Sequence, residues 1–129
     1  MAFVINHIHL KAPEPRSTAE WYVKAFGFEI LSDTVRSFGD RRLNCVSPGG
    51  LIVNISSARD GETMADGDAG SHWGLEHFGV DSDDLLADME RLGALGAPLI
   101  EGPIDVPGGN LIAFMQGPDD VRIEIVQQR

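Results

Sequence analysis

The chain has 129 residues, of which 43% are hydrophobic and 23% are charged, a composition typical of one ordinary globular domain. Its formal net charge of −10 disfavours nucleic acid and anionic membranes as partners, because both require a basic face. Cys45 is the only cysteine, so a disulfide within the chain is excluded and a reducing compartment is expected. The first residues lack the basic lead and the long apolar run of a signal peptide or anchor, so we expect a cytoplasmic protein.

The first half of the chain is predicted to form a strand, a helix and three further strands. Residues 4–12 read as a strand, and Ser17 with Glu20 has the spacing of a capping box at a helix start. An apolar stripe at helical spacing follows and ends at Gly27. The stripe consists of Ala19, Tyr22, Val23 and Phe26. The three strands are expected over residues 28–35, 41–46 and 51–55.

The second half repeats this order. A strand over residues 72–80 precedes a helix from Asp83 to about Leu92, and three strands follow over 98–104, 111–115 and 121–126. Residues 57–71 are rich in Gly, Asp and Ser and read as a linker that is long enough to be mobile or functional. We therefore expect one module over about 1–56, this linker, and a second module over about 72–129.

An internal repeat with an offset of 70 residues supports this division. It aligns 6–10 with 76–80 and 47–55 with 117–125 without a gap. His7 thereby falls on His77, and Asn54 falls on Glu124. A duplicated fold would place these side chains at matching points of its two halves.

Side chains alternate between the two faces of a strand, so each predicted strand has an apolar face suited to packing under a helix and an opposite polar face. A curved sheet with its helices outside would collect the polar faces in its hollow. These faces carry His7, His9 and Lys11 on the first strand, Asn54 on the fourth, His77 on the fifth, and Arg122 and Glu124 on the last.

Three short motifs, in this order, resemble those of the vicinal oxygen chelate superfamily, which includes glyoxalase I, extradiol dioxygenases and bleomycin-resistance proteins. They are His7 to Leu10 with Trp21-Tyr22 and Gly27-Phe28, then His77 with Asp83-Asp84-Leu85, and then Pro118-Asp119 leading to Glu124. The resemblance covers essentially the whole chain. It implies an α+β fold of two tandem βαβββ modules that form a curved, mixed-sheet half-barrel with helices outside, and commonly a homodimer.

The resemblance also implies a divalent metal ion bound by His7, His77 and Glu124. Two imidazoles and one carboxylate with open positions suit Fe, Mn, Zn, Ni or Co. Asn54 occupies the position of a fourth ligand, where glyoxalase I carries an acid, so simple glyoxalase I activity is not expected. The remaining positive charge of such a site favours a substrate with an anionic or vicinal pair of oxygens.

Other residues of the polar faces are candidates for catalysis and substrate binding. His9 is the nearby candidate acid or base, and Glu124 is expected to contribute to catalysis as a ligand. We expect His72 to lie at the surface and Cys45 to be an unreactive buried thiol. Candidate substrate-binding residues are Asn54, Lys11, Trp73 and Arg122.

Three function classes fit these features. The first is a metal-dependent isomerase, epimerase or lyase in which the ion acts as a Lewis acid. The second is an Fe(II) extradiol-type dioxygenase, although the further His and Tyr that such enzymes supply before the final Glu are missing here. The third is a metal-free protein that binds a small molecule, as in bleomycin resistance. A fosfomycin transferase ranks lower because no anion-binding loop is evident.

Overall fold

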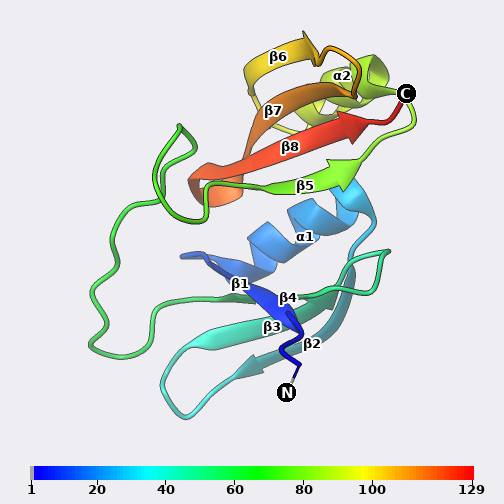
Figure 1. Ribbon diagram of the computed structural model, residues 1–129. Coiled ribbons are helices and arrows are strands. Elements are labelled where there is room, and N and C mark those ends of the chain that lie inside the picture. Colours follow the sequence, from blue (N-terminus) through cyan, green and yellow to red (C-terminus); the bar gives the residue numbers. More distant parts are fainter. Residues whose placement is uncertain (1) are drawn as a thin grey trace. The chain divides into compact units, whose positions relative to one another are not determined.

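The computed structural model describes residues 2–129, so Met1 of the expected first module lies outside the described residues. The first half forms β1 (His7–Lys11), α1 (Pro15–Phe26), β2 (Glu29–Val35), β3 (Arg41–Val46) and β4 (Ile52–Ser56). The second half forms β5 (Phe78–Asp81), α2 (Leu85–Ala94), β6 (Leu99–Asp105), β7 (Leu111–Gly117), the short 3-10 helix η1 (Pro118–Asp120) and β8 (Val121–Gln127). Both halves therefore have the order βαβββ (Figure 1).

The chain divides into two compact units whose boundary falls between Ala65 and Asp66, inside the expected linker. The first unit contains a mixed four-stranded sheet in the order β1-β4-β3-β2, and the second a sheet in the order β5-β8-β7-β6. The predicted α+β fold with two βαβββ modules is thus confirmed. Within residues 2–129 no helix is long and apolar enough to cross a membrane.

The strand registers of the two units match at the offset of 70 residues. His9 lies opposite Asn54 across the parallel pair β1/β4, and Gly79 lies opposite Glu124 across β5/β8. On the other side, Asn44 of β3 lies opposite Asn54, and Phe114 of β7 lies opposite Glu124. Residues 70 positions apart in the sequence therefore occupy equivalent places in the strand pairing of the two sheets.

Each helix covers the apolar face of its own sheet, as the strand alternation predicts. The fully buried side chains under α1 include Leu43, Cys45, Val53 and Ile55, packed with Tyr22 of the helix. Those under α2 include Ala113, Met115, Ile123 and Ile125, packed with Leu85 and Leu92. Burial raises the pKa of the Cys45 thiol, which agrees with an inert buried cysteine.

Two details of the first helix differ from the prediction. The helix begins at Pro15 after the N-cap Glu14, and no side-chain hydrogen bond caps it, so the predicted Ser17–Glu20 capping box is wrong. Proline is well suited to the first helical turn because its missing N–H would have no partner there. Val23 is exposed, whereas Ala25 is buried, so the apolar stripe is rotated from the predicted one. Gly27 ends the helix in the left-handed conformation, as predicted.

The fifth strand begins at Phe78 instead of residue 72. The ring of His72 lies 3.0 Å from the carbonyl oxygens of both Gly70 and Leu75, and Gly74 adopts a φ of 88°. These contacts fold residues 70–75 into a compact turn. An alternating sequence pattern alone cannot distinguish this turn from an extended strand.

The start of the expected linker packs onto the first unit. The amide of Arg41 donates to Ser57 Oγ at 2.9 Å, and the amide of Asp60 donates to the carbonyl of Phe38 at 2.8 Å. Gly39 permits this approach, because a Cβ at that position would lie 2.2 Å from Asp60 Oδ1. The segment after β4 is therefore fixed beside the β2–β3 turn.

The Arg36–Asp40 pair should stabilise this turn. Asp40 is fully buried, and Arg36 Nε and Nη2 donate to its Oδ2 at 3.0 and 2.7 Å. These bonds hold the pKa of Asp40 below its usual value despite the opposing effect of burial. Because the pKa of Asp40 is lower in the folded state, the pair stabilises the folded protein fully above the unfolded-state pKa. This stabilisation is lost as pH falls through the folded-state pKa.

We predict that Asp40→Asn lowers the thermal unfolding midpoint at neutral pH by more than about 5 °C, since it leaves Arg36 without its buried partner. The difference from the wild type should shrink as the solution is acidified. Asp105→Asn is the matched control, because Asp105 forms a pair with Arg129 in which both side chains are largely exposed. Equal midpoints for the two variants would contradict the stabilising role of the Arg36–Asp40 pair.

Candidate metal and substrate site

Two of the three predicted metal ligands meet in the second unit. His77, just before β5, places Nε2 2.8 Å from Oε2 of Glu124 on the neighbouring strand β8. Both side chains are partly exposed, and the His77 ring packs edge-on against Phe114 at 5.2 Å. An imidazole nitrogen and a carboxylate oxygen, which are common ligand atoms for divalent metal ions, thus converge on the polar face of this sheet.

A second carboxylate orients the His77 ring. Glu76 Oε1 lies 3.0 Å from His77 Nδ1, and this contact contributes most to holding the pKa of Glu76 below its usual value. With Nδ1 held by Glu76, the ring is oriented so that Nε2 faces Glu124. The offset of 70 residues places Asn6 at the equivalent position, and Asn6 Oδ1 contacts His7 Nδ1. In both predicted histidine ligands, Nδ1 is therefore contacted by a side-chain oxygen of the preceding residue.

Arg122 is a buried member of the same network, with only 5% of its area exposed. Its guanidinium donates to the carbonyl of Ala69 at 3.1 Å, lies 3.5 Å from Glu76 and 3.4 Å from Glu101, and stacks 4.2 Å from the centre of the Phe114 ring. Because these partners engage the guanidinium, the structure favours a positioning role for Arg122 over binding of a substrate carboxylate.

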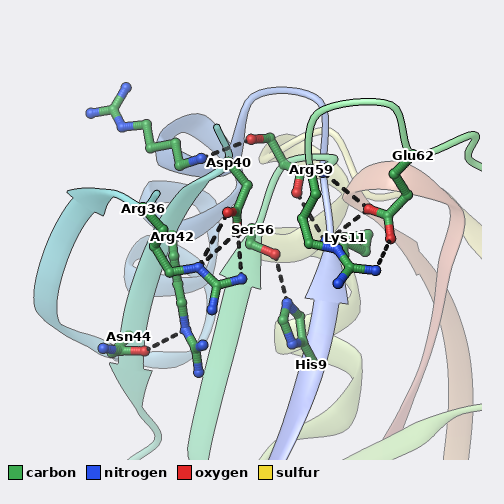
Figure 2. A network of polar contacts seen from close by, with 11 residues as sticks. His9, Lys11, Arg36, Asp40, Arg42, Asn44, Ser56, Arg59 and Glu62 are labelled. Atoms are coloured by element: carbon green, nitrogen blue, oxygen red, sulfur yellow. Dashed lines mark hydrogen bonds and ion pairs between the residues drawn. The ribbon is translucent and has the colours of Figure 1, made fainter. Parts of the chain in front are cut away.

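In the first unit the polar face is arranged around His9 (Figure 2). His9 Nε2 lies 2.7 Å from Oγ of the buried Ser56. Burial lowers the pKa of His9, with smaller contributions in the same direction from nearby cations, beginning with Lys11 and Arg42. This environment favours the neutral imidazole, the form that can accept a proton.

Asn54 carries a buried acceptor atom on this face that has no partner in the described part of the chain. It is 3% exposed and lies on β4 between His9 and Asn44, but its Oδ1 has no hydrogen-bond partner within the described residues. A buried acceptor without a partner is costly, so this position suits a ligand that supplies a donor or a positive charge.

The remaining predicted site residues occupy different environments. Lys11 donates to the carbonyl of Ser57 at 3.0 Å and pairs with Glu62 at 3.3 Å. Trp73 is 100% exposed in the turn before β5, so it is not part of the core of its unit. Its predicted contact with substrate, and the predicted substrate contact of Asn54, stay predictions.

Neither unit, over residues 2–129, gathers three or more His, Cys, Asp or Glu side chains into a ligand group by itself. His7 belongs to the first unit, whereas His77 and Glu124 belong to the second. The full set of three ligands therefore stays a prediction that requires a contribution from each unit.

Sequence reasoning missed several residues of these networks. Glu76 could have been found by asking what precedes each repeated histidine, because the repeat aligns it with Asn6. Strand parity would have placed Asn44 and Arg42 on the polar face of β3. The contact of Arg122 with Phe114 carried no sequence signal, since it depends on side-chain direction across two strands.

Comparison with known proteins agrees with this architecture. The family model described as Glyoxalase/Bleomycin resistance protein/Dioxygenase superfamily matches residues 4–125. The chain belongs to this superfamily. The match includes every strand up to Ile125 and all the candidate ligands described above.

Individual members of the superfamily are similar to this chain at low identity. A probable lactoylglutathione lyase of Vibrio cholerae is 25% identical over 130 residues, covering 97% of this chain and 91% of that protein. A lactoylglutathione lyase of Arabidopsis thaliana is 26% identical over 133 residues, which cover 95% of this chain but only 43% of the plant protein. This chain thus spans less than half the length of the plant relative.

A solved structure shows the same fold. The fosfomycin resistance protein FosX from Listeria monocytogenes, in complex with Mn(II) and a sulfate ion, has a TM-score of 0.71 and 15% identity. The alignment covers 98% of this chain and 93% of FosX.

We predict that the turn over residues 70–75 is sensitive to pH through His72. Both ring nitrogens face carbonyl oxygens, which only accept, so the contacts favour the doubly protonated ring. The hydrogen bond to Gly70, followed by that to Leu75, raises the pKa of His72. Stability from a raised pKa is present below the unfolded-state value of about 6.5 and is lost as pH rises through the folded-state value.

Amide-exchange protection of residues 70–75 should therefore decrease between about pH 5.5 and pH 8. His72→Gln should abolish this dependence, while protection of β7 serves as the internal control. A pKa for His72 measured by NMR at or below the ordinary histidine value would contradict the prediction.

Proposed function

We propose that this protein is a divalent-metal-dependent enzyme of the lyase or isomerase type, acting on a small substrate with vicinal oxygens. The observation that carries the proposal is the contact between His77 Nε2 and Glu124 Oε2 at 2.8 Å. These two predicted ligands are in direct contact, and His7 occupies the repeated position in the first unit. The lactoylglutathione lyases among the similar proteins support the same class.

The residues present fit a metal ion. Glu76 and Asn6 contact the Nδ1 atoms of His77 and His7, so Nε2 of each ring would be the ligand atom. At His77 an ion would replace the present contact of Nε2 with Glu124. Glu124 supplies the negative charge, and the FosX complex shows that this fold accommodates Mn(II) in another protein. Bound there, an ion would polarise the oxygens of the substrate as a Lewis acid. The candidates Fe, Mn, Zn, Ni and Co all suit this donor set.

The residues of the first unit would handle the substrate. His9 is held by Ser56 through Nε2 and lies on the polar face next to Asn54, so it is the proposed acid or base. Asn54 replaces the acid of glyoxalase I, and its amide oxygen is a hydrogen-bond acceptor instead of a proton acceptor. His9 would therefore take over the proton-transfer role. We further propose a cytoplasmic location, as expected from the sequence, and a homodimer, as the family resemblance implies.

Replacement of Glu124 tests the metal site. Glu124→Ala should lose stoichiometric metal, because it removes the only negative charge among the three ligands, while the fold persists since Glu124 is on the polar face. Elemental analysis of protein purified without added metal would measure this, with thermal unfolding as the check on the fold. Glu90→Ala, on the exposed face of α2, is the control that should keep its metal. A metal-free wild type would favour a binding or resistance protein instead.

Replacement of His9 tests the proposed acid or base. His9→Gln should keep the metal but lower turnover by about 10²-fold or more, since glutamine cannot exchange a proton near neutral pH. The assay would follow a series of vicinal diols and α-hydroxycarbonyl compounds in a metal-loaded sample. His72→Gln removes an imidazole from a turn and should leave turnover unchanged. Full activity of His9→Gln would reduce His9 to a pocket-lining residue. Oxygen uptake with an iron-loaded sample would indicate a dioxygenase.

A further inference from the structure

The polar face of the first unit carries an excess of positive charge in a chain whose net charge is −10. Figure 2 shows the side chains of this face around β1, β3 and β4, with the guanidinium groups of Arg36 and Arg42 on the same side as the His9 ring. The cations are Lys11, Arg36, Arg42 and Arg59, and the carboxylates paired with them are Asp40 and Glu62. Even when Asp60 of the same segment is counted, three carboxylates against four cations leave a local surplus of positive charge that attracts anions.

Arg42 accounts for part of this surplus. Its Nε donates to Asn44 Oδ1 at 3.1 Å, whereas its two terminal nitrogens have no hydrogen-bond or ion-pair partner within residues 2–129. In contrast, Arg36 binds Asp40, and Arg59 binds Glu62. The terminal edge of the Arg42 guanidinium is thus open to a ligand on a half-buried surface.

The direction of the guanidinium is fixed by a chain of hydrogen bonds. Asn44 accepts from Arg42 and donates through Nδ2 to Ser32 Oγ at 2.8 Å, so its amide orientation is fixed by two partners. Arg42 therefore extends toward the row of residues in which Asn44, Asn54 and His9 lie side by side on adjacent strands. Preorganisation of this kind reduces the entropy lost when a ligand binds.

The same row contains the unpartnered Oδ1 of Asn54. A guanidinium edge requires an oxyanion, and a buried amide oxygen requires a hydrogen-bond donor. A single small molecule that carries an oxyanion and a hydroxyl group satisfies both requirements at once.

We propose that Arg42 and Asn54 form a binding subsite for a small hydroxylated oxyanion, with Arg42 binding the carboxylate or phosphoryl oxygens and Asn54 Oδ1 accepting from the hydroxyl. As a subsite of the proposed enzyme, which rests on the proposed function, it defines the substrate as an anion whose charged end lies beside His9. His7 and His9 are two residues apart on β1, about 7 Å along the strand, so the charged end and the metal-chelating oxygens would be separate groups of one substrate.

Binding of two simple probes tests the subsite without any metal. Glycolate and inorganic phosphate, each carrying an O–H donor, would be titrated into the metal-free full-length protein at constant ionic strength. Nitrogen-15 NMR of the Arg42 Nε–H and the Asn44 and Asn54 side-chain amides should show saturable shifts with at least one probe. Saturation by glycolate alone would identify a carboxylate as the charged group, and saturation by phosphate alone a phosphoryl group.

Three variants make the result specific. Arg42→Gln should abolish saturation, and Arg42→Lys, which keeps the charge but lacks the fork, should weaken binding on the order of tenfold. Arg41→Gln is the matched control, because it removes the same charge from the neighbouring residue, which is exposed and paired with Asp33. It should leave binding unchanged. Thermal unfolding would verify that each variant is folded.

The proposal is overturned if neither probe saturates in the wild type, or if Arg42→Gln binds as tightly as the wild type. Equal losses in Arg41→Gln and Arg42→Gln would also overturn it, because they would indicate general electrostatic attraction. Since metal is absent throughout, these outcomes are independent of metal binding. A protein without a metal site would still show the subsite, and a metalloenzyme without the subsite would fail only this test.

Discussion

The parallel pairing between the first and last strands of each βαβββ unit determines where the chemistry of this protein lies. It sets His9 against Asn54 in the first unit and Gly79 against Glu124 in the second. A slip of one residue would turn Glu124 toward α2 and bring Ile123 or Ile125 to the polar face, with a loss of buried apolar area in the same step. The core and the site are therefore specified by one register.

Within this common frame the two units carry different side chains. The second unit has a histidine–carboxylate contact supported by Glu76 and Arg122, whereas the first has an amide at the carboxylate position and a group of cations. Divergence after a duplication is easiest on the polar face, because substitutions there leave the packing under the helix unchanged. The proposed division between metal binding and substrate binding follows from that freedom.

Most of the fold could be predicted because strand alternation, helical periodicity and the repeat agree with one another. The errors occur where a local contact overrides the pattern. The His72 contacts with two carbonyl groups turn residues 70–75 away from an extended strand, and Pro15 begins the first helix before the expected capping box. The repeat could align His7 with His77, but the fixed direction of Arg42 depends on its contact with Asn44, which no sequence pattern encodes.

The contact between the β2–β3 turn and the segment after β4 allows a residue of that turn to affect the electric field at the polar face of the first unit. Glu62, which neutralises Lys11 and Arg59, is held in place by a segment whose Asp60 binds Phe38 and fits against Gly39. A side chain at Gly39 would force the Asp60 carboxylate to turn away or the segment to shift. If the segment shifts, Glu62 moves from Lys11 and the face becomes more cationic. Ligand preference could thus evolve through a turn that never contacts the ligand.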